Sequence, residues 1–357
     1  MIVTIDKYIE DLNNNLHIMS RTSNGHLDIT SSKKKKDEML IHDEQVAKEI
    51  AIANFNRAIK YAYIHKDDEF KSPQEIKNFI EEIALIITEG IIDKANLYRH
   101  GDECLKYHYV KIKDIPKTID LFCEKLFNQF KKNYDPIYVA AMSEFYIDMR
   151  GHFYMDGCCK TSMIVSAYCL MRKDIAVASY VSRNLYFKYE PRTYENDASD
   201  LRRFHKYYKL IHAAKDLWNE YSKNNNVKST SYDIIHYDYE TIDLLLSGNK
   251  RAISSLKKMY DIKKKNLPYT NEYKIIFDKK DEVVGIVRVE DVKIVKFKDI
   301  SYDFALAEAE GDYTLAYWKY AHSNKFREAL EEYDVSFNVD MEVVCEYIKL
   351  VCKVVYE

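Results

Sequence analysis

The sequence lacks the features that mark membrane and secreted proteins. It contains no run of about 18 apolar residues, which argues against a membrane-spanning helix. Its first residues, MIVTIDKYIEDLNNN, are acidic early and have no apolar signal core. The seven cysteines are an odd number in a chain of 357 residues, which is typical of a reducing compartment. We therefore expect a cytoplasmic protein with no membrane partner.

The chain also lacks an excess of charge of either sign. It has 54 Lys and Arg against 57 Asp and Glu, a net charge of −3, so no general attraction to nucleic acid or membranes is expected, although a local patch stays open. Glycine is scarce, with 8 residues, whereas tyrosine is abundant, with 31. Because 47% of the residues are apolar and the chain is too long for one ordinary core, we expect two packed domains.

Helical patterns dominate the first two thirds of the chain. Residues 1–40 form a polar segment, and its lysine run, TSSKKKKDE, is expected to be a solvated tail, with anion contact as the alternative. Apolar residues at spacings of three and four predict helices over 43–63, 73–89, 117–132, 136–149, 160–171 and 202–221. Alternation in YHYVKIKDIP predicts a short hairpin over 107–116.

The character of the sequence changes after SKNNNVKSTS, residues 222–231, the best linker in the chain. β-branched runs such as EYKIIFD and MEVVCEYIKLVCKVV predict a small sheet or barrel. Between them we expect a glycine turn into a basic helix at 247–260, and an acidic turn into a helix carrying Trp318 and His322. The predicted organisation is a multidomain chain, with a polar segment 1–40, a mainly α-helical domain 41–222, a linker 223–231 and a β-rich domain 232–357.

The stretch GHFYMDGCCK, residues 151–160, crowds reactive side chains between two apolar segments. A zinc set is disfavoured, because adjacent cysteines point apart and no second C-x-x-C completes it. A redox pair is disfavoured too, because the two-residue spacer is missing. Two interpretations stay open. One is a plain turn between helices, with the cysteines as small buried apolar groups; the other is a phosphate-binding turn at a helix N-terminus.

In the phosphate-binding interpretation each residue has a chemical role. Gly157 lets the backbone approach a phosphate closely, and Asp156 holds Mg²⁺ through its carboxylate. Lys160 meets a phosphate oxygen as a point charge. His152 acts as general base on an attacking hydroxyl. This set suits phosphoryl or nucleotidyl transfer.

The same stretch resembles a degenerate Fic motif, H-x-F-x-D/E-G-N-G-R-x-x-R. His152 stands at the family's catalytic histidine, and Asp156 and Gly157 match. The positions that depart from the pattern are Tyr154, Cys158, Cys159, Lys160 and Met163. Upstream, ITEGIIDKANLYRHGD (87–102) resembles a segment of the family, YHYVKIKDIP resembles its flap hairpin, and Asp135-Pro136 falls where its buried helix begins. The resemblance covers about residues 43–220.

The Fic resemblance implies an Mg²⁺-dependent transferase that modifies a protein hydroxyl, with a nucleoside triphosphate, ATP foremost, as donor. His152 would be catalytic, Asp156 would bind the metal, and the phosphate-binding residues would be Gly157, Cys158, Cys159 and Lys160. Met163 replaces the arginine that contacts the γ-phosphate. The stretch EIAIANFN (49–56) resembles the family's inhibitory helix, with Ala53 in place of its glutamate. Both halves of the inhibitory ion pair are therefore absent, as expected either for a site without this switch or for a decayed one.

Two segments of the β-rich domain together resemble the ASCH domain, a small PUA-like β-barrel, over about residues 232–357. The first, SGNKRAISSLKKMY, matches G-x-K-x-A-T-x-S-L at Gly248, Lys250, Ala252, Ser255 and Leu256. The second, DFALAEAEGDYTLAYWKYAH, matches E-G-E-G-D…W…H at Glu308, Glu310, Gly311, Asp312, Trp318 and His322. Taken without the family, both segments are surface features around a barrel, with Trp318 as a core anchor.

The ASCH resemblance implies binding of RNA or a nucleotide, and some members hydrolyse an acylated cytidine with a lysine and a threonine. Lys250 keeps the lysine, but Ile253 occupies the threonine position, so we expect binding rather than hydrolysis. Lys250, Glu308 and Glu310 form the expected ligand site. Three hypotheses follow: a Fic-type transferase with an ASCH binding module, an inactive Fic-fold scaffold with the same module, and an ASCH-based nucleoside hydrolase. The target protein and the oligomeric state are left open.

Overall fold

A computed structural model describes residues 3–20, 39–101, 109–190, 196–229, 231–263 and 265–354. The chain divides into two compact units, Met1–His212 and Ala213–Glu357. The division falls inside one helix, α8 (Asp197–Asn224), upstream of the linker predicted at 223–231. That predicted linker remains a prediction.

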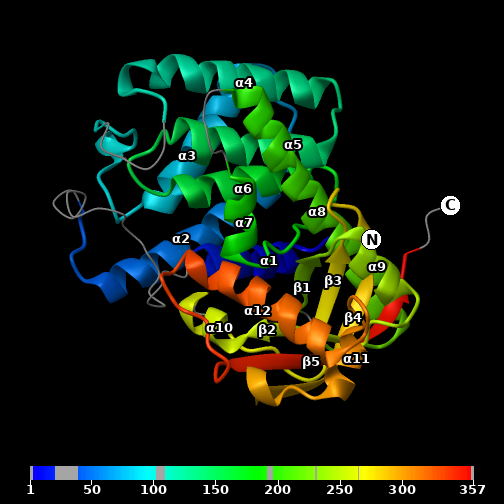
Figure 1. Cartoon of the computed structure of the whole chain (residues 1–357). Coiled ribbons are helices and arrows are strands. Elements are labelled where there is room, and N and C mark those ends of the chain that lie inside the picture. The colour runs from blue at the N-terminus through cyan, green and yellow to red at the C-terminus, as the bar shows by residue number, and fades with distance from the viewer. Residues whose placement is uncertain are drawn as a thin grey trace. The chain divides into compact units, whose positions relative to one another are not determined.

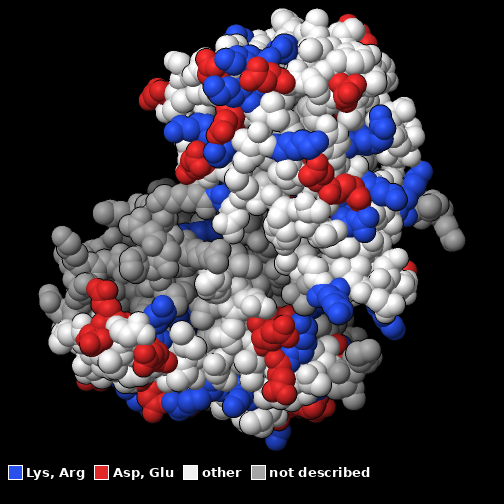
Figure 2. Space-filling view, turned by 90° about the horizontal axis from the view of Figure 1, so that it is seen from below, with Lys and Arg blue, Asp and Glu red and all other residues white. Residues whose placement is uncertain are grey.

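Basic and acidic side chains are interspersed over the face drawn in Figure 2, as the near balance of charge predicts. None of the helices in the described parts of the chain combines the length and the apolar character needed to cross a bilayer.

The first unit is helical, as predicted (Figure 1). Its helices are α1 (Ile5–Ser20), α2 (Glu44–Ile64), α3 (Pro73–Thr88), α4 (Ile115–Lys131), α5 (Pro136–Glu144), α6 (Cys158–Met171), α7 (Arg183–Tyr189) and the first part of α8. Short 3₁₀ turns lie at η2 (Lys94–Asn96) and η3 (Ile112–Asp114), and a π-helical segment, η4 (Phe145–Gly151), continues α5.

Helix α6 lies at the centre of this unit and contacts α1, α2, α3 and α5. Every residue of α6 except Cys159 and Lys160 is buried. The sequence KTSMIVSAYCLM is apolar around its whole circumference, which is typical of a helix enclosed on all sides. The segment that begins at Gly151 therefore leads directly into the core of the unit.

The N-terminal polar segment holds a helix that the sequence analysis missed. Helix α1 buries Tyr8, Leu12 and Leu16, which are spaced four residues apart on one face. Asn15 is fully buried as well, and its side-chain amide donates to the carbonyl oxygen of Ala178 over 2.9 Å. The lysine run at 33–36 lies outside the described residues.

The hairpin predicted over 107–116 is wrong for the residues that the structure describes. Residues 109–116 contain no strand: η3 occupies Ile112–Asp114, and α4 begins at Ile115. Pro116 lies in the first turn of α4, where its fixed φ suits the helix and its missing N–H leaves no hydrogen bond unmade. Residues 107 and 108 lie outside the described part of the chain.

The second unit contains a five-stranded mixed sheet, curled into a half-barrel, in the order β1-β3-β4-β5-β2. The strands are β1 (Asp233–His236), β2 (Ala252–Leu256), β3 (Tyr273–Phe277), β4 (Val283–Lys296) and β5 (Glu342–Lys353). β1 is parallel to β3, and the other pairs are antiparallel. The long β4–β5 ladder shifts register at two places along β4, Ile286/Val287 and Val289/Asp291.

Both faces of the sheet are covered by apolar clusters. Trp318, Phe304 and Phe326 pack with Val343 and Leu256 on one side, beneath α11 (Tyr302–Glu308) and α12 (Leu315–Glu331). The other cluster contains Ile242 and Leu245 of α9 (Tyr239–Leu246), packed with Ile276, Val287 and Ile348. Trp318 is therefore a core anchor.

The stretch 247–260 differs from its prediction. Gly248 makes the expected turn with φ +78°, but β2 follows it before the basic helix α10 (Lys257–Lys263) begins. The β-branched and serine run AISS pairs with β5 over its whole length, because β5 presents an unpaired edge there. The helix carrying Trp318 and His322 is α12, as predicted.

Candidate functional site

The predicted phosphate-binding turn lies at the N-terminus of α6. Gly157 is the N-cap and has a left-handed backbone, with φ +75°. A Cβ atom at this position would lie 2.7 Å from Cγ2 of Ile87, at the end of α3. Contact with the protein's own core thus explains why this position is a glycine. A role of Gly157 in binding a ligand remains a prediction.

His152 is held firmly in the turn between η4 and α6. Its φ of 44° is left-handed, and its carbonyl oxygen accepts a hydrogen bond from Nε of Arg99 at 2.6 Å. The imidazole stacks on the Tyr109 ring, with centroids 4.3 Å apart, and its side chain is 18% exposed. Nδ1 lies 3.3 Å from the carbonyl oxygen of Asp148 and 3.9 Å from its carboxylate. The histidine is oriented and accessible, as a base would need to be.

Among the described residues, the other motif positions do not form a set of three ligands for a metal ion. Asp156 and Lys160 are half-buried. Within the described residues, the one group of three or more side chains that could hold a metal ion lies elsewhere, in the second unit. Mg²⁺ commonly uses one or two carboxylates plus substrate phosphates, so Asp156 would need a bound nucleotide to complete its site.

The two cysteines have packing roles. Sγ of Cys158 lies 3.3 Å from both the amide nitrogen and the carbonyl oxygen of Tyr154, which closes the turn before α6. Burial, with Asp148 as the next cause, raises the pKa of the Cys159 thiol well above its usual value, so the group stays protonated. Met163 is 1% exposed and lines a small internal cavity with Leu12. Ala53 lies exposed on α2.

A buried acidic cluster beside the motif was not foreseen. The carboxylate of Glu144 is 1% exposed and accepts hydrogen bonds from three phenols, at 2.5 Å from Tyr180, at 2.7 Å from Tyr186, and from Tyr208. Burial raises the pKa of Glu144 in spite of these donors. Burial and the neighbouring Glu144 raise the pKa of Asp148 to about 7. An acidic residue inside the apolar run VAAMSEFYIDM was the available signal.

Lys250 is the best-defined polar group of the second unit. It is 3% exposed, and its ammonium group donates to the carbonyl oxygen of Glu308 at 3.1 Å and to Oε1 of Glu310 at 2.7 Å. The backbone amide of Lys250 donates to Leu244, and the next amide, of Arg251, donates to Ala307. These bonds fix the turn between α9 and β2 against the end of α11. Lys250 therefore meets Glu308 and Glu310, which lie 58 and 60 positions further along the chain.

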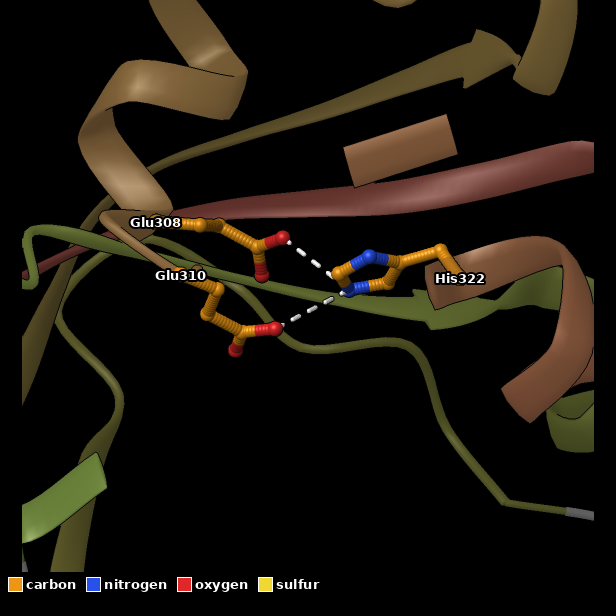
Figure 3. Close-up of side chains that lie close together, drawn as sticks. All are labelled: Glu308, Glu310 and His322. Atoms are coloured by element: carbon orange, nitrogen blue, oxygen red, sulfur yellow. Dashed lines mark ion pairs between the residues drawn. The ribbon is translucent and has the colours of Figure 1, made fainter. Parts of the chain in front are cut away.

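Glu308 is the centre of a second set of contacts (Figure 3). Its Oε2 accepts from Nε1 of Trp318 and from Oγ of Ser254 at 3.2 Å, and it lies 3.1 Å from Nε2 of His322. Burial alone would raise the pKa of Glu308, but His322, Lys250 and Trp318 hold it below its usual value. Glu308 is therefore an ionised carboxylate inside the protein.

Glu308, Glu310 and His322 offer ligand atoms within 4.8 Å of one another. In Figure 3 the imidazole, carried by α12, faces the two carboxylates, which come from the end of α11 and the turn after it. A divalent cation would face Lys250 here, because that ammonium group is already 2.7 Å from Glu310. The positive charge that the two carboxylates require is thus supplied by the protein itself.

The second unit contains another buried ion pair, which the sequence analysis missed. Lys274 on β3 contacts the carboxylate of Glu346 on β5, and their side chains are 6% and 3% exposed. Lys274 also lies 3.9 Å from Glu272. Burial raises the pKa of Glu346 and of Glu272, with Lys274 partly offsetting it. Single charged residues within the runs EYKIIF and VVCEYI were the signal for this pair.

Both ion pairs line one hollow of about 710 Å³. Ile253, Ser254 and Tyr237 contribute to its wall. A second hollow, of about 820 Å³, lies between α9 and α11 and includes Leu246, Leu306 and Tyr347. Lys250 lines both hollows. The volume of the first hollow is typical of a small-molecule site.

Comparisons with known proteins find likeness to two kinds of domain. The family model of the ASCH domain matches residues 233–352. The ASCH domain from Lactobacillus crispatus JV V101 is 29% identical, with 39% of this chain and 91% of that chain covered and a TM-score of 0.37. None of the curated proteins matches the chain.

Two Fic-domain structures are also among the similar ones. Fic-1 from C. elegans is 15% identical, with 63% of this chain and 67% of that chain covered and a TM-score of 0.43. A Fic domain containing signaling protein from Bacteroides thetaiotaomicron VPI-5482 is 15% identical, with 59% and 89% covered and a TM-score of 0.39. The ASCH assignment is confirmed by the family model, and likeness to Fic-domain structures is found, as expected.

Proposed function

Because residues 233–352 form an ASCH domain, we propose that the second unit binds a nucleoside or nucleotide in the 710 Å³ hollow. The observation that carries this proposal is Lys250, buried beside the hollow between the Glu308 carbonyl and the Glu310 carboxylate. Burying a lysine and its carboxylate is costly, and such pairs bring little stability in return. A binding role gives a reason for keeping them.

The polar groups around Lys250 support binding rather than hydrolysis. Ile253 has no hydroxyl, and the neighbouring Ser254 donates its hydroxyl to Glu308. Because the pKa of Glu308 lies below its usual value, this carboxylate is a weak base for activating a serine. A hydrolase reaction would need a nucleophile that neither residue supplies well.

Calorimetric titration tests the proposal. The full chain is titrated with the four ribonucleosides, their 5′-monophosphates and a short single-stranded RNA. We expect at least one nucleoside or nucleotide to bind, and Lys250→Met to weaken it by about tenfold or more, the loss of one charge-assisted hydrogen bond. The control is Lys257→Met, which breaks an exposed pair with Glu342 outside the hollow and should leave affinity unchanged. Binding of the RNA alone, or equal affinity in both variants, would refute a nucleotide site at Lys250.

A second function, nucleotidyl or phosphoryl transfer to a protein hydroxyl in the first unit, is favoured by the orientation of His152. Its ring is accessible and stacked on Tyr109, beside an acid whose pKa is about 7. Asp156 would hold Mg²⁺ and Lys160 a phosphate, while the metal would neutralise charge on the transferred group. The buried Glu144 and Asp148 oppose a phosphate close to the start of α6.

Incubation with Mg²⁺ and ATP, followed by mass spectrometry of the protein itself, tests this second function. Transfer should fall by about 100-fold to 10,000-fold in His152→Ala, the usual cost of losing a general base. Because Met163 is apolar, ATP should bind no better than ADP. A tenfold preference for ATP, or undiminished transfer in the variant, would refute these roles.

A further inference from the structure

The lysines that line the 710 Å³ hollow fall into two groups. Lys250 and Lys274 are buried, and each forms an ion pair. Lys263, Lys265, Lys279 and Lys325, which we call the mouth lysines, are exposed. Within the described residues no mouth lysine lies within 4.0 Å of a carboxylate, whereas Lys257 and Lys298 lie 2.6 and 2.8 Å from theirs.

Most carboxylates that line the hollow lie in its depth, whereas most of its lysines lie at the mouth. Five of them are buried or half-buried, and these are Asp233, Glu272, Glu308, Glu310 and Glu346. Only two lysines accompany them in the depth. The single exposed carboxylate among the described lining residues is Asp238, which caps α9 by accepting from the amide of Thr241 at 2.9 Å. The mouth therefore carries four positive charges and one negative, whereas the depth is acidic.

The mouth lysines act together on this rim. Two hydrogen bonds from Thr241 lower the pKa of Asp238, and the charges of Lys279 and Lys325 lower it further. Both lysines therefore lie near the same carboxylate, although α12 and the turn after β3 are distant in the sequence. Lys263 and Lys265 approach from the end of α10. An anion at the mouth would meet positive charge from three separate segments that line the hollow.

From this division of charge we infer that the ligand is a phosphorylated nucleotide, with its phosphate at the mouth lysines and its nucleoside part in the depth. The inference rests on the proposed nucleoside or nucleotide site. A phosphate in the depth would be repelled by five carboxylates, whereas at the mouth it is attracted by four ammonium groups that act as point charges. An uncharged nucleoside is compatible with the acidic depth, where carboxylates accept hydrogen bonds from base amino and ribose hydroxyl groups.

The experiment compares each of the four ribonucleosides with its own 5′-monophosphate, and with inorganic phosphate, by calorimetry on the full chain. We expect the monophosphate of the base that binds to exceed its nucleoside by about tenfold at low salt. The advantage should shrink as salt rises, because exposed charges are screened. Inorganic phosphate should compete only weakly, since it leaves the depth empty.

Charge-matched variants locate the phosphate. Replacing the four mouth lysines with alanine should remove the tenfold advantage but leave nucleoside affinity unchanged. The control removes four other lysines, Lys257, Lys293, Lys296 and Lys298, which are absent from the lining of the hollow, and should keep the advantage. All eight side chains reach solvent, so both variants should stay folded, which circular dichroism checks.

The outcomes separate the two proposals. If a nucleoside binds as tightly as its monophosphate, or if both quadruple variants lose the advantage equally, the inference is overturned and the nucleoside site stands. If neither nucleosides nor monophosphates bind, the proposed function itself fails, and this inference fails with it.

Discussion

Gly157 and Gly90 share a left-handed backbone, with φ of +75° and +71°, but have different surroundings. A Cβ atom at Gly157 would lie 2.7 Å from Ile87, whereas a Cβ atom at Gly90 would meet nothing within 4 Å. Comparison of the two positions therefore separates the cost of the backbone conformation from the cost of crowding.

We expect Gly90→Ala to lower the free energy of unfolding by about 1 kcal/mol, the cost of a left-handed backbone with a side chain. Gly157→Ala should lower it by about 1–3 kcal/mol more, because Ile87 must move. Urea unfolding followed by circular dichroism measures both. Equal losses would show that Ile87 makes room for the added methyl group at no cost.

Asp148 makes stability depend on pH. Its pKa is about 7 in the folded protein, mainly because of burial, against about 3.9 in an unfolded chain. Between these values the folded state binds more protons, so this group stabilises the protein fully below about pH 4, and its contribution is lost as pH rises to about 7.

Asp148→Asn should remove this dependence. The difference in the free energy of unfolding between wild type and variant should change by up to about 1.4 kcal/mol per pH unit between pH 4 and 7, with the wild type favoured at the acid end. Above pH 7 the difference should be constant. Urea titrations at four pH values decide it, with the exposed Asp114→Asn as the control that should follow the wild type. A wild type that gained stability relative to the variant between pH 4 and pH 7 would contradict the assignment.

Single residues were predictable where a motif carried them. Because the family pattern marks these positions, Lys250 was expected to lie opposite Glu308 or Glu310, and it contacts both. Glu144 and Lys274 were not foreseen. Each is one charged residue within an apolar run, and only the folded chain shows which partner compensates it, three phenols for the first and Glu346 for the second.

At the scale of elements, the Lys274–Glu346 pair joins β3 to β5 across β4. Lys274→Met should lower the free energy of unfolding by about 3–5 kcal/mol, because it leaves Glu346 buried and uncompensated. The double variant Lys274→Met/Glu346→Leu should regain most of this loss, because apolar residues replace both charges. Urea unfolding of the two single variants and the double variant gives the coupling energy.

The exposed pair of Lys298 and Asp340, at 2.8 Å, is the matched control. Lys298→Met should leave the midpoint of urea unfolding nearly unchanged, as is usual for surface ion pairs. If the double variant at Lys274 and Glu346 is no more stable than the single Lys274 variant, the pair is not the reason for the loss.

Elements with strong periodicity were predictable, and those decided by tertiary contacts were not. Helices α2, α3 and α4 follow their apolar spacing to within a few residues. α1 was missed because its three buried apolar residues are diluted by a polar sequence, and the hairpin was predicted from alternation that in fact surrounds a 3₁₀ turn. β2 needed the edge of β5, which no local pattern reveals.

For the whole molecule, the division inside α8 predicts where the chain can be cut. Trp218 is 4% exposed and packs on Tyr273 and Tyr232, with centroids 5.0 and 5.5 Å away. A fragment of residues 213–357 should therefore unfold with a free energy about 3–5 kcal/mol larger than that of a fragment of residues 232–357, the usual cost of losing a buried tryptophan.

Thermal and urea unfolding of the two fragments measure this difference. Trp218→Ala in the longer fragment should reproduce most of the loss, whereas Asn225→Ala, at an exposed position of the same segment, should not. Fragments of equal stability would place the boundary of the unit at the predicted linker instead.

Lys250 lines two hollows at once, and its single ammonium group cannot serve both equally. A molecule that binds between α9 and α11 and attracts the Lys250 ammonium group moves that charge away from the first hollow, which Lys274 also lines. Two occupants would then be antagonists, and thermodynamic reciprocity requires each to weaken the other by the same factor. The side chain that anchors the proposed site is in this way also the means by which a second molecule could control it.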